Sequence, residues 1–328
     1  MNKMRVSVII PTRNRCELLK VMLESVKNQN FSDDDYEIIV VDNASTDNTK
    51  DVVEECNHNG GKTVLYVREE HAGLHNARHT GARIAKGGVL VFCDDDIVAS
   101  KGWLEAVSQS FSDKDVALVG GKILPLYQGK PPPWLESLWM RTRHGRALGY
   151  LSLLDLGDEP KEIPPTCVYG CNFSIRKDVL YECGGFHPDS MPDDLIRFRG
   201  DGETALARAV RQKGYKVLYH PAALVYHRVT QDRMVPEYFY KRAFAQGISD
   251  SYTDIRKGEA NKPCRNITRH LGPISWFVRW RFKVGLRFVY SLRKNYLKGY
   301  VFHHAEVARD PDLLTWVQKP SYFEGSIE

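Results

Sequence analysis

Residues 89–97 read VLVFCDDDI, an apolar run that leads directly into Asp94, Asp95 and Asp96. The apolar run predicts a buried strand, with the three aspartates following at the edge of a sheet. Adjacent carboxylates repel one another, so clustering them costs stability unless a cation or strong hydrogen-bond donors lie between them. Oxygen ligands at the carboxyl end of a strand suit Mg²⁺ or Mn²⁺. We therefore expect a divalent metal here, with a solvated turn or an aspartate-capped helix start as the alternative.

The composition allows one large catalytic unit and excludes some partners. The 328 residues are 42% apolar, and the net charge is +5. A chain of this length can bury a large core, whereas so small a net charge gives no general affinity for nucleic acid. The seven cysteines are odd in number and irregularly spaced, so we expect no disulfide framework. Because no apolar run resembles a signal peptide or a membrane span, we expect a cytoplasmic protein.

Short apolar runs alternate with amphipathic segments from residue 5 to about 97. This pattern predicts strands at 5–11, 36–43, 63–68 and 89–94, with helices between them at 16–29, 45–56 and 74–86. The alternation indicates an α/β fold of the doubly wound type with a mostly parallel central sheet and flanking helices. Polar residues end the first, second and fourth strands, and we expect them to line one crevice.

Five blocks are similar, in content and order, to family 2 glycosyltransferases of the GT-A fold. They are SVIIPTRNR (7–15), VVDNASTDNT (40–49), AGLHNARHTGARIAKGGVLVFCDDD (72–96), YGCNFSIRKDVL (169–180) with GGF (184–186), and GDGETALARAVRQKGYKVLYHPAALVYH (200–227). The resemblance implies a GT-A catalytic domain over 1–230, with a nucleotide-binding half at 1–100 and an acceptor half at 101–230. Residues 231–328 would then form a basic, helical C-terminal extension.

The resemblance also implies a nucleotide-sugar donor, expected to be UDP-linked, with Mn²⁺ or Mg²⁺ as cofactor. Asp94 and Asp96 fit the family's DxD pattern, with Asp95 between them as a further donor contact. We expect Asp96 to bind the metal directly and Asp94 to bind the ribose or the metal. His227 would complete the metal site or contact the diphosphate, although a lone histidine is often a satisfied core or surface group.

Other residues take donor roles by the same resemblance. Asp42 would accept a hydrogen bond from the nucleobase, and Pro11, Thr12 and Arg13 would flank the base, largely through backbone contacts. Arg78 would contact the diphosphate or the base, because a guanidinium matches such oxygens. The alternatives are an aspartate that serves only a strand-end turn and a solvated arginine on a helix.

Inverting transfer needs a general base near the acceptor hydroxyl, and a carboxylate is the usual choice. The segment GDGE (200–203) supplies Asp201 and Glu203 where the family typically reads GED or GD. Gly202 stands where many relatives have the aspartate of an ED pair. We favour Asp201 as the base and keep Glu203 as the second candidate. Both carboxylates could instead cap the helix that follows.

The acceptor side is less clearly marked. Asn172 resembles an acceptor-side residue, and PPPWLESLW (131–139) offers Trp134 and Trp139 for stacking on a sugar. Tryptophans at such positions also serve as packing residues. The implied acceptor is a glycan or a lipid-linked glycan in surface polysaccharide assembly, and the implied enzyme is a hexosyl- or N-acetylhexosaminyltransferase.

The C-terminal extension carries a local surplus of positive charge. No acidic residue lies between Glu259 and Glu306. Plotted at 100° per residue, 274–298 predicts one amphipathic helix with a basic side. Its apolar side consists of Phe277, Trp280, Val284, Phe288 and Leu292. Such a helix either docks on the core or lies on an anionic membrane surface, at the inner face of the cell membrane.

The sequence therefore predicts a metal-dependent, inverting glycosyltransferase. Two other functions remain open at this point. A metal-dependent phosphohydrolase or nucleotidyltransferase using the same aspartates would release phosphate or nucleotide to water, without a sugar acceptor. A relative that binds nucleotide sugars without catalysis is the second, although the retention of Asp42, Asp94, Asp96 and a candidate base weakens it.

Overall fold

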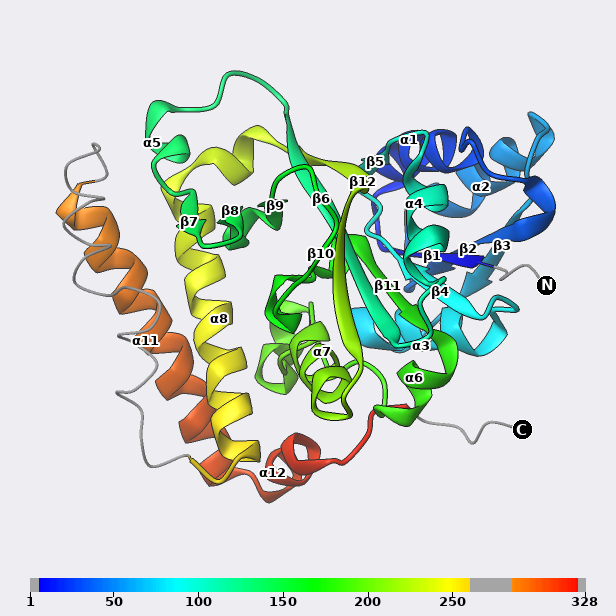
Figure 1. The fold of residues 1–328 in the computed structure, drawn as a ribbon. Coiled ribbons are helices and arrows are strands. Elements are labelled where there is room, and N and C mark those ends of the chain that lie inside the picture. Colours follow the sequence, from blue (N-terminus) through cyan, green and yellow to red (C-terminus); the bar gives the residue numbers. More distant parts are fainter. Residues whose placement is uncertain (1–5, 260–284, 324–328) are drawn as a thin grey trace.

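A twelve-stranded mixed sheet lies at the centre of the computed structural model, which describes residues 6–259 and 285–323 (Figure 1). Its main path runs β3-β2-β1-β4-β11-β6-β9-β8-β7, and β12 pairs with β5, β6 and β10. The strands are β1 (Val6–Thr12), β2 (Tyr36–Asp42), β3 (Val64–Arg68), β4 (Val89–Phe92), β5 (Ile97–Ala99), β6 (Val116–Tyr127), β7 (Met140–Thr142), β8 (Gly145–Leu148), β9 (Leu153–Asp155), β10 (Lys161–Glu162), β11 (Phe173–Arg176) and β12 (Lys216–Val229).

Helices cover both faces of this sheet, with α1, α2 and α4 above it and α3 and α6 below it in Figure 1. The helices are α1 (Cys16–Lys27), α2 (Thr49–His58), α3 (Leu74–Ile84), α4 (Trp103–Ser110), α5 (Pro133–Glu136), α6 (Lys177–Glu182), α7 (Glu203–Gln212), α8 (Pro236–Arg256), α11 (Leu286–Arg309) and α12 (Pro311–Gln318). Two short 3₁₀ helices used below are η2 (Gly149–Leu151) and η6 (Gln231–Met234).

The N-terminal half forms the predicted parallel sheet. β1 pairs in parallel with β2 and β4, and all seven residues of β1 are buried. Strands buried on both faces read as continuous apolar runs, which is why the pattern identified them. The prediction of an α/β fold with a mostly parallel sheet and flanking helices is confirmed, although β11 runs antiparallel to β4 and β6.

The second predicted helix begins later than expected. α2 starts at Thr49, not at Ser45. The backbone N–H of Ser45 donates to Asp42 Oδ1 (2.7 Å), and that of Thr49 donates to Asp47 Oδ1 (3.2 Å). The side chain of Asp42 therefore closes a turn first, and the helix starts only after Asp47.

The predicted amphipathic helix over 274–298 is present from Leu286 to Lys298, as the first part of α11. α11 begins at Leu286, because Gly285 before it is extended (φ −61°, ψ 149°). Residues 274–284 lie outside the described residues. The apolar side of α11 packs on α8 through the buried residues Val289, Leu292, Tyr296 and Tyr300. Exposed basic side chains cover its outer side: Arg287, Arg293, Lys294 and Lys298.

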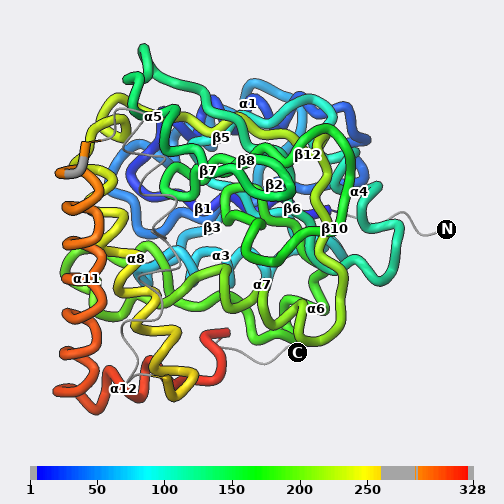
Figure 2. Tube along the Cα trace, turned by 60° about the vertical axis from the view of Figure 1, so that its left-hand side comes forward, coloured from blue at the N-terminus to red at the C-terminus, as the bar shows by residue number. Residues whose placement is uncertain are grey.

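α8 and α11 lie side by side in both views (Figures 1 and 2). Two glycines allow their backbones to approach closely. A Cβ on Gly247 would overlap the carbonyl oxygen of Tyr296, and one on Gly299 would overlap that of Phe244. Near the start of α11, Phe288 packs on Phe239 of α8, with ring centroids 6.0 Å apart. The apolar side of α11 is therefore used within the protein.

The last described residues pack against α3 and α6. Ser321 Oγ donates to the carbonyl oxygen of Gly184 (2.9 Å), and the ring of Phe323 packs on Tyr181 and His79.

Over residues 6–259 and 285–323, the structure contains no helix whose length and hydropathy would let it cross a bilayer.

The glycine contact predicts a measurable loss of stability. Gly247→Ala should force α8 and α11 apart, since the new methyl group meets backbone and not a movable side chain. We expect the free energy of unfolding to fall by about 1–3 kcal/mol, measured by urea denaturation. Gly102→Ala is the matched control, because a Cβ there meets nothing within 4 Å. Equal stability of the two variants would contradict the close contact.

Candidate functional site

The three aspartates follow β4 and lie beside the loop after β1. Thr12, the last residue of β1, donates from Oγ1 to Asp95 Oδ2 (2.8 Å). Arg15 donates from one nitrogen to Asp95 Oδ1 (3.0 Å) and lies 3.5 Å from Asp96 Oδ2. Arg15, and not the exposed Arg13, is therefore the arginine of this loop that reaches the aspartates.

Asp96 is enclosed by cationic and hydrogen-bonding partners. It is 2% exposed, and its Oδ2 accepts a hydrogen bond from Arg233 (2.7 Å). His227 Nε2 lies 3.1 Å from Asp96 Oδ1. β12 places His227 there, because its antiparallel pairing with β5 sets His227 opposite Ile97, the residue after Asp96. The predicted association of Asp96 with His227 is thus present in the structure.

His227 is held in one orientation. Its Nδ1 lies 2.8 Å from the carbonyl oxygen of Leu151 in η2. A carbonyl oxygen only accepts, so Nδ1 carries a proton and Nε2 is the nitrogen that faces the site. Arg233 also approaches this Nε2, at 3.3 Å.

These contacts shift the pKa values of the neighbouring carboxyls in different directions. Burial would raise the pKa of Asp96, but the hydrogen bond and charge of His227, with the charge of Arg233, hold it below its usual value. Burial raises the pKa of Asp95 to about 6, against the opposing charge of Arg15. Burial also raises the pKa of Asp94, with Arg78 opposing it. Asp96 is therefore the carboxylate that is most firmly ionised.

Arg78 joins the aspartates to the predicted catalytic segment. Its guanidinium is 2% exposed and lies over the ring of Phe186, 4.9 Å from the centroid. One nitrogen lies 3.5 Å from Asp94 Oδ1, and the other lies 3.8 Å from Glu203 Oε2. Asp94 and Glu203 are the more accessible carboxylates, with side-chain exposures of 32% and 23%. One buried cation thus separates two carboxylates that can reach a ligand.

Glu203, at the start of α7, lies in a setting that suits a proton acceptor. Burial and the charge of Asp189 raise the pKa of its carboxyl, against the opposing charge of Arg78. The backbone N–H of Gly170 donates to its Oε1 (3.2 Å), which leaves Oε2 on the side of Arg78. Gly202 before it has φ +55°, a left-handed conformation that glycine adopts at low cost.

Asp201 has a different environment from Glu203. Its side chain is 7% exposed and accepts a hydrogen bond from Thr253 Oγ1 of α8 (2.9 Å). Its other oxygen lies 2.7 Å from His187 Nδ1. Tyr252 extends this network from His187 to the hydroxyl of Tyr322 near the end of the described chain. Asp201 therefore connects the catalytic segment to the C-terminal helices.

The end of β2 holds Asp42, the predicted nucleobase contact. Its carboxylate is 1% exposed and accepts from Tyr66 Oη (2.6 Å) and from Arg68 (3.3 Å), both on β3. With the Ser45 N–H, three donors already point at it. Pro11 is buried within β1, one residue before Thr12. The residues at this corner that present exposed polar groups include Arg68, which is 42% exposed.

The two predicted acceptor residues are used for packing. Asn172 is 1% exposed, and its amide bonds with Trp103 Nε1 (3.0 Å) and with the carbonyl oxygen of Ala223 (2.8 Å). Trp134 packs edge to face on Phe239 and against Phe288, with centroids 5.5 and 5.6 Å apart. The structure thus shows packing contacts for Asn172 and Trp134, and their assignment to the acceptor stays a prediction. These contacts position the sheet and the loop around α5.

The donor set at Asp96 suits a divalent cation that shares its ligands with a substrate. Asp96 offers an ionised oxygen and His227 a fixed Nε2, a combination that Mn²⁺ accepts. Over residues 6–259 and 285–323, the structure gathers no group of three His, Cys, Asp or Glu side chains that could hold a metal ion. Cations bound with nucleotides commonly take remaining ligands from phosphate and water. Residues Asp96 and His227 therefore fit a cation bound together with a diphosphate.

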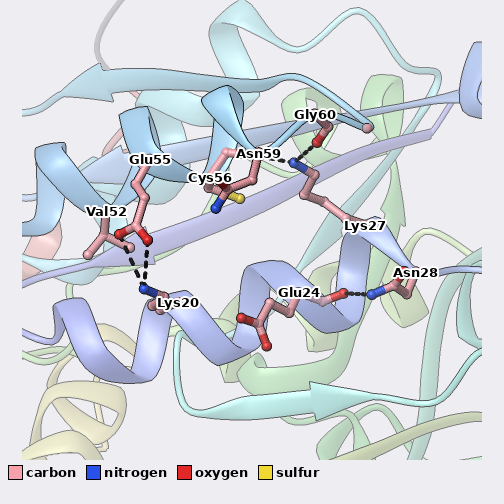
Figure 3. Close-up of a pocket in the computed structure, with 10 residues that line it drawn as sticks. Lys20, Glu24, Lys27, Asn28, Val52, Glu55, Cys56, Asn59 and Gly60 are labelled. Carbon is pink, nitrogen blue, oxygen red and sulfur yellow. Dashed lines mark hydrogen bonds and ion pairs between the residues drawn. The ribbon is translucent and has the colours of Figure 1, made fainter.

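A hollow between α1 and α2 has a structural explanation (Figure 3). Lys20 Nζ lies 3.0 Å from Glu55 Oε1, and Lys27 Nζ donates to the carbonyl oxygen of Cys56 (2.7 Å). These contacts tie the two helices together, and the lining contains no predicted site residue. We assign this hollow no ligand.

Sequence reasoning missed three residues that contact the predicted site aspartates: Arg15, Tyr66 and Arg233. Arg15 lies two residues after Arg13 in the quoted block PTRNR, so the block itself contained the arginine that reaches the aspartates. Tyr66 could have been found from the alternation of β3, which places it on the same face as Arg68, the residue paired with Asp42. Arg233 carries no such signal, because the fold around β12 and η6 brings it to Asp96.

The chain is similar in sequence to known glycosyltransferases. The glucosyl-dolichyl phosphate glucuronosyltransferase of Haloferax volcanii is 26% identical over 263 residues, covering 79% of this chain and 80% of that protein. The poly(ribitol-phosphate) beta-glucosyltransferase of Bacillus spizizenii is 35% identical over 103 residues, covering 31% of this chain and 16% of that protein.

Solved structures share the fold at low sequence identity. The mannosyltransferase PcManGT from Pyrobaculum calidifontis, in complex with GDP-Man and Mn²⁺, gives a TM-score of 0.57 at 19% identity, covering 98% of this chain and 86% of that chain. TarS 1–349 of S. aureus in complex with UDP-GlcNAc gives a TM-score of 0.53 at 16% identity, covering 96% of this chain and 91% of that chain. The described residues thus adopt the GT-A fold. Residues 7–184 match the family described as Glycosyl transferase family 2, and the chain belongs to this family of glycosyltransferases.

Proposed function

We propose that this glycosyltransferase moves a sugar, with inversion, from a nucleoside diphosphate donor to a glycan or lipid-linked acceptor. One observation carries the proposal. Arg78 connects Asp94 of the aspartate triplet to Glu203, so a donor-side carboxylate and a candidate base lie on opposite sides of one guanidinium. Family membership favours this reaction over the phosphohydrolase and nucleotidyltransferase alternatives.

Glu203 replaces Asp201 as the preferred base in this proposal. Glu203 Oε2 would take the proton of the acceptor hydroxyl while the oxygen of that hydroxyl forms a bond to the anomeric carbon of the donor sugar. The bond from that carbon to the diphosphate oxygen breaks, and its electron pair leaves with the diphosphate. Attack from the side opposite the leaving group inverts the anomeric centre. Asp201 is a poorer candidate, because Thr253 and His187 occupy its oxygens.

The donor would lie along the carboxyl ends of β1, β2 and β4. Asp42, Tyr66 and Arg68 would hold the nucleobase, and the triplet would face the ribose and diphosphate. A divalent cation bound to Asp96 and His227 would supply positive charge to the leaving diphosphate. UDP remains the proposed nucleotide, and two structural neighbours bind GDP-Man and UDP-GlcNAc. Comparing UDP with GDP therefore decides the nucleotide.

Two relatives support the proposed acceptor class. Their names specify a glucosyl-dolichyl phosphate and a poly(ribitol-phosphate). We propose a comparable phosphate-containing acceptor in surface glycan assembly. The exposed basic side of α11, Arg287, Arg293, Lys294 and Lys298, would attract an anionic membrane that carries such an acceptor, by charge and without insertion. Flotation with anionic vesicles at low salt tests this, and a complete lack of binding would exclude it.

The first test concerns the metal. Asp96→Asn keeps the shape of the side chain but removes its charge, so Mn²⁺ should no longer strengthen UDP or GDP binding in calorimetry. In the unchanged protein, Mn²⁺ should raise the affinity for one of these nucleotides. Asp113→Asn, an exposed aspartate on the loop before β6, is the matched control. If Mn²⁺ does not change the nucleotide affinity of the unchanged protein, the metal role is excluded.

The second test separates the two candidate bases. Glu203→Gln should lower transfer by about 10²-fold or more while donor affinity is retained, since only the proton acceptor is lost. Asp201→Asn should mainly lower the thermal unfolding midpoint, because it disturbs the contacts to His187 and Thr253. If Asp201→Asn removes transfer and Glu203→Gln does not, the base must be reassigned to Asp201.

A further inference from the structure

Arg233 occupies the position that the proposed function gives to a metal ion. Its guanidinium contacts Asp96 Oδ2 at 2.7 Å and His227 Nε2 at 3.3 Å. These are the same two groups that would bind the cation. The side chain of Arg233 is 16% exposed, so the contact is largely shielded from solvent.

A guanidinium and a divalent cation exclude each other at this position. Arginine stays protonated in proteins, so Arg233 cannot make way by losing its charge. Two positive groups at contact distance repel strongly in a partly buried site. Arg233 also lies 3.3 Å from His227 Nε2, the nitrogen that a metal ion would need. Cation entry therefore requires Arg233 to move.

The chain around Arg233 allows such a movement without unfolding. Arg233 lies on η6, a four-residue turn between β12 and α8. The next residue, Met234, is buried and anchors the turn. Besides its contacts with Asp96 and His227, the guanidinium donates to the carbonyl oxygen of Arg228 at 3.4 Å. Rotation of the side chain would release it while the backbone stays in place.

We propose that Arg233 exchanges partners when the donor binds: it leaves Asp96 and His227 to the cation and binds the donor diphosphate. The proposal rests on the proposed function, because it needs the cation and the diphosphate at this site. A planar guanidinium matches phosphate oxygens with two parallel hydrogen bonds. The diphosphate supplies the negative charge that Arg233 loses when it leaves Asp96.

This exchange couples the two ligands. The cation alone has to displace Arg233 without giving it a new partner, so it binds weakly. With diphosphate present, the displaced guanidinium is neutralised, so each ligand strengthens the binding of the other. When no donor is bound, Arg233 thereby neutralises the charge of Asp96. When the donor is bound, Arg233 contributes to the affinity for the donor.

Arg233→Met tests the exchange, because it removes the charge and keeps an unbranched side chain. We expect two effects of opposite sign in calorimetry. The affinity for Mn²⁺ alone should rise about tenfold or more, since the competitor is gone, and the affinity for UDP or GDP at saturating Mn²⁺ should fall about tenfold or more. Arg233→Lys should give affinities between those of Arg233→Met and those of the unchanged protein. Lys241→Met removes an exposed charge on α8 and serves as the control.

The opposite signs distinguish the exchange from simpler roles. A purely structural arginine would lower both affinities, and an arginine that only binds diphosphate would leave Mn²⁺ affinity unchanged. A rise in both affinities would mean that Arg233 only competes with the cation. Each of these results overturns the exchange. If the unchanged protein binds nucleotide without regard to Mn²⁺, the metal site itself fails, and the exchange fails with it.

Discussion

The site depends on the pairing of three clustered carboxylates with arginines, Asp95 and Asp96 being buried and Asp94 partly exposed. Asp94 faces Arg78, Asp95 faces Arg15, and Asp96 faces Arg233 and Arg15. Without such partners, the charges at the end of β4 would repel one another in a region of low dielectric. The sequence suggested a metal as the simplest partner, but the structure shows that guanidinium groups already fulfil this requirement. The fold therefore does not need a cation at Asp96, and the proposed cation would serve only the reaction.

The arginines come from distant parts of the chain, and this ties the fold to the site. Arg15 follows β1, Arg78 belongs to α3, and Arg233 follows β12. The pairing of β12 with β5 and β6 is what brings His227 and then η6 to the triplet. The C-terminal helices also reach the catalytic segment, since Thr253 of α8 bonds with Asp201, close to Glu203. α8 and α11 thus support the segment that carries the proposed base.

Local patterns predicted the sheet well and the partners of its side chains poorly. The strands β1, β2 and β4 read as apolar runs because both of their faces are buried, and the triplet stood out because its charges follow such a run. The sequence favours Asp201 over Glu203 because it keeps the GD form seen in some relatives, and it does not reveal the left-handed conformation of Gly202 just before Glu203. Nor does it show that Trp134 meets Phe239 and Phe288, residues more than 100 positions away. The amphipathic pattern over 274–298 was real at Val289 and Leu292, but it marked a contact with α8.

The pH dependence of transfer tests most directly the claim that Glu203 takes the acceptor proton. Burial and Asp189 raise the pKa of Glu203 above its ordinary 4.5, and a base works only when ionised. The account predicts that kcat/KM falls as the pH drops through a midpoint above 4.5, and that this acid limb is absent from the residual activity of Glu203→Gln. An unchanged acid limb in Glu203→Gln, or one that disappears only in Asp201→Asn, would contradict it.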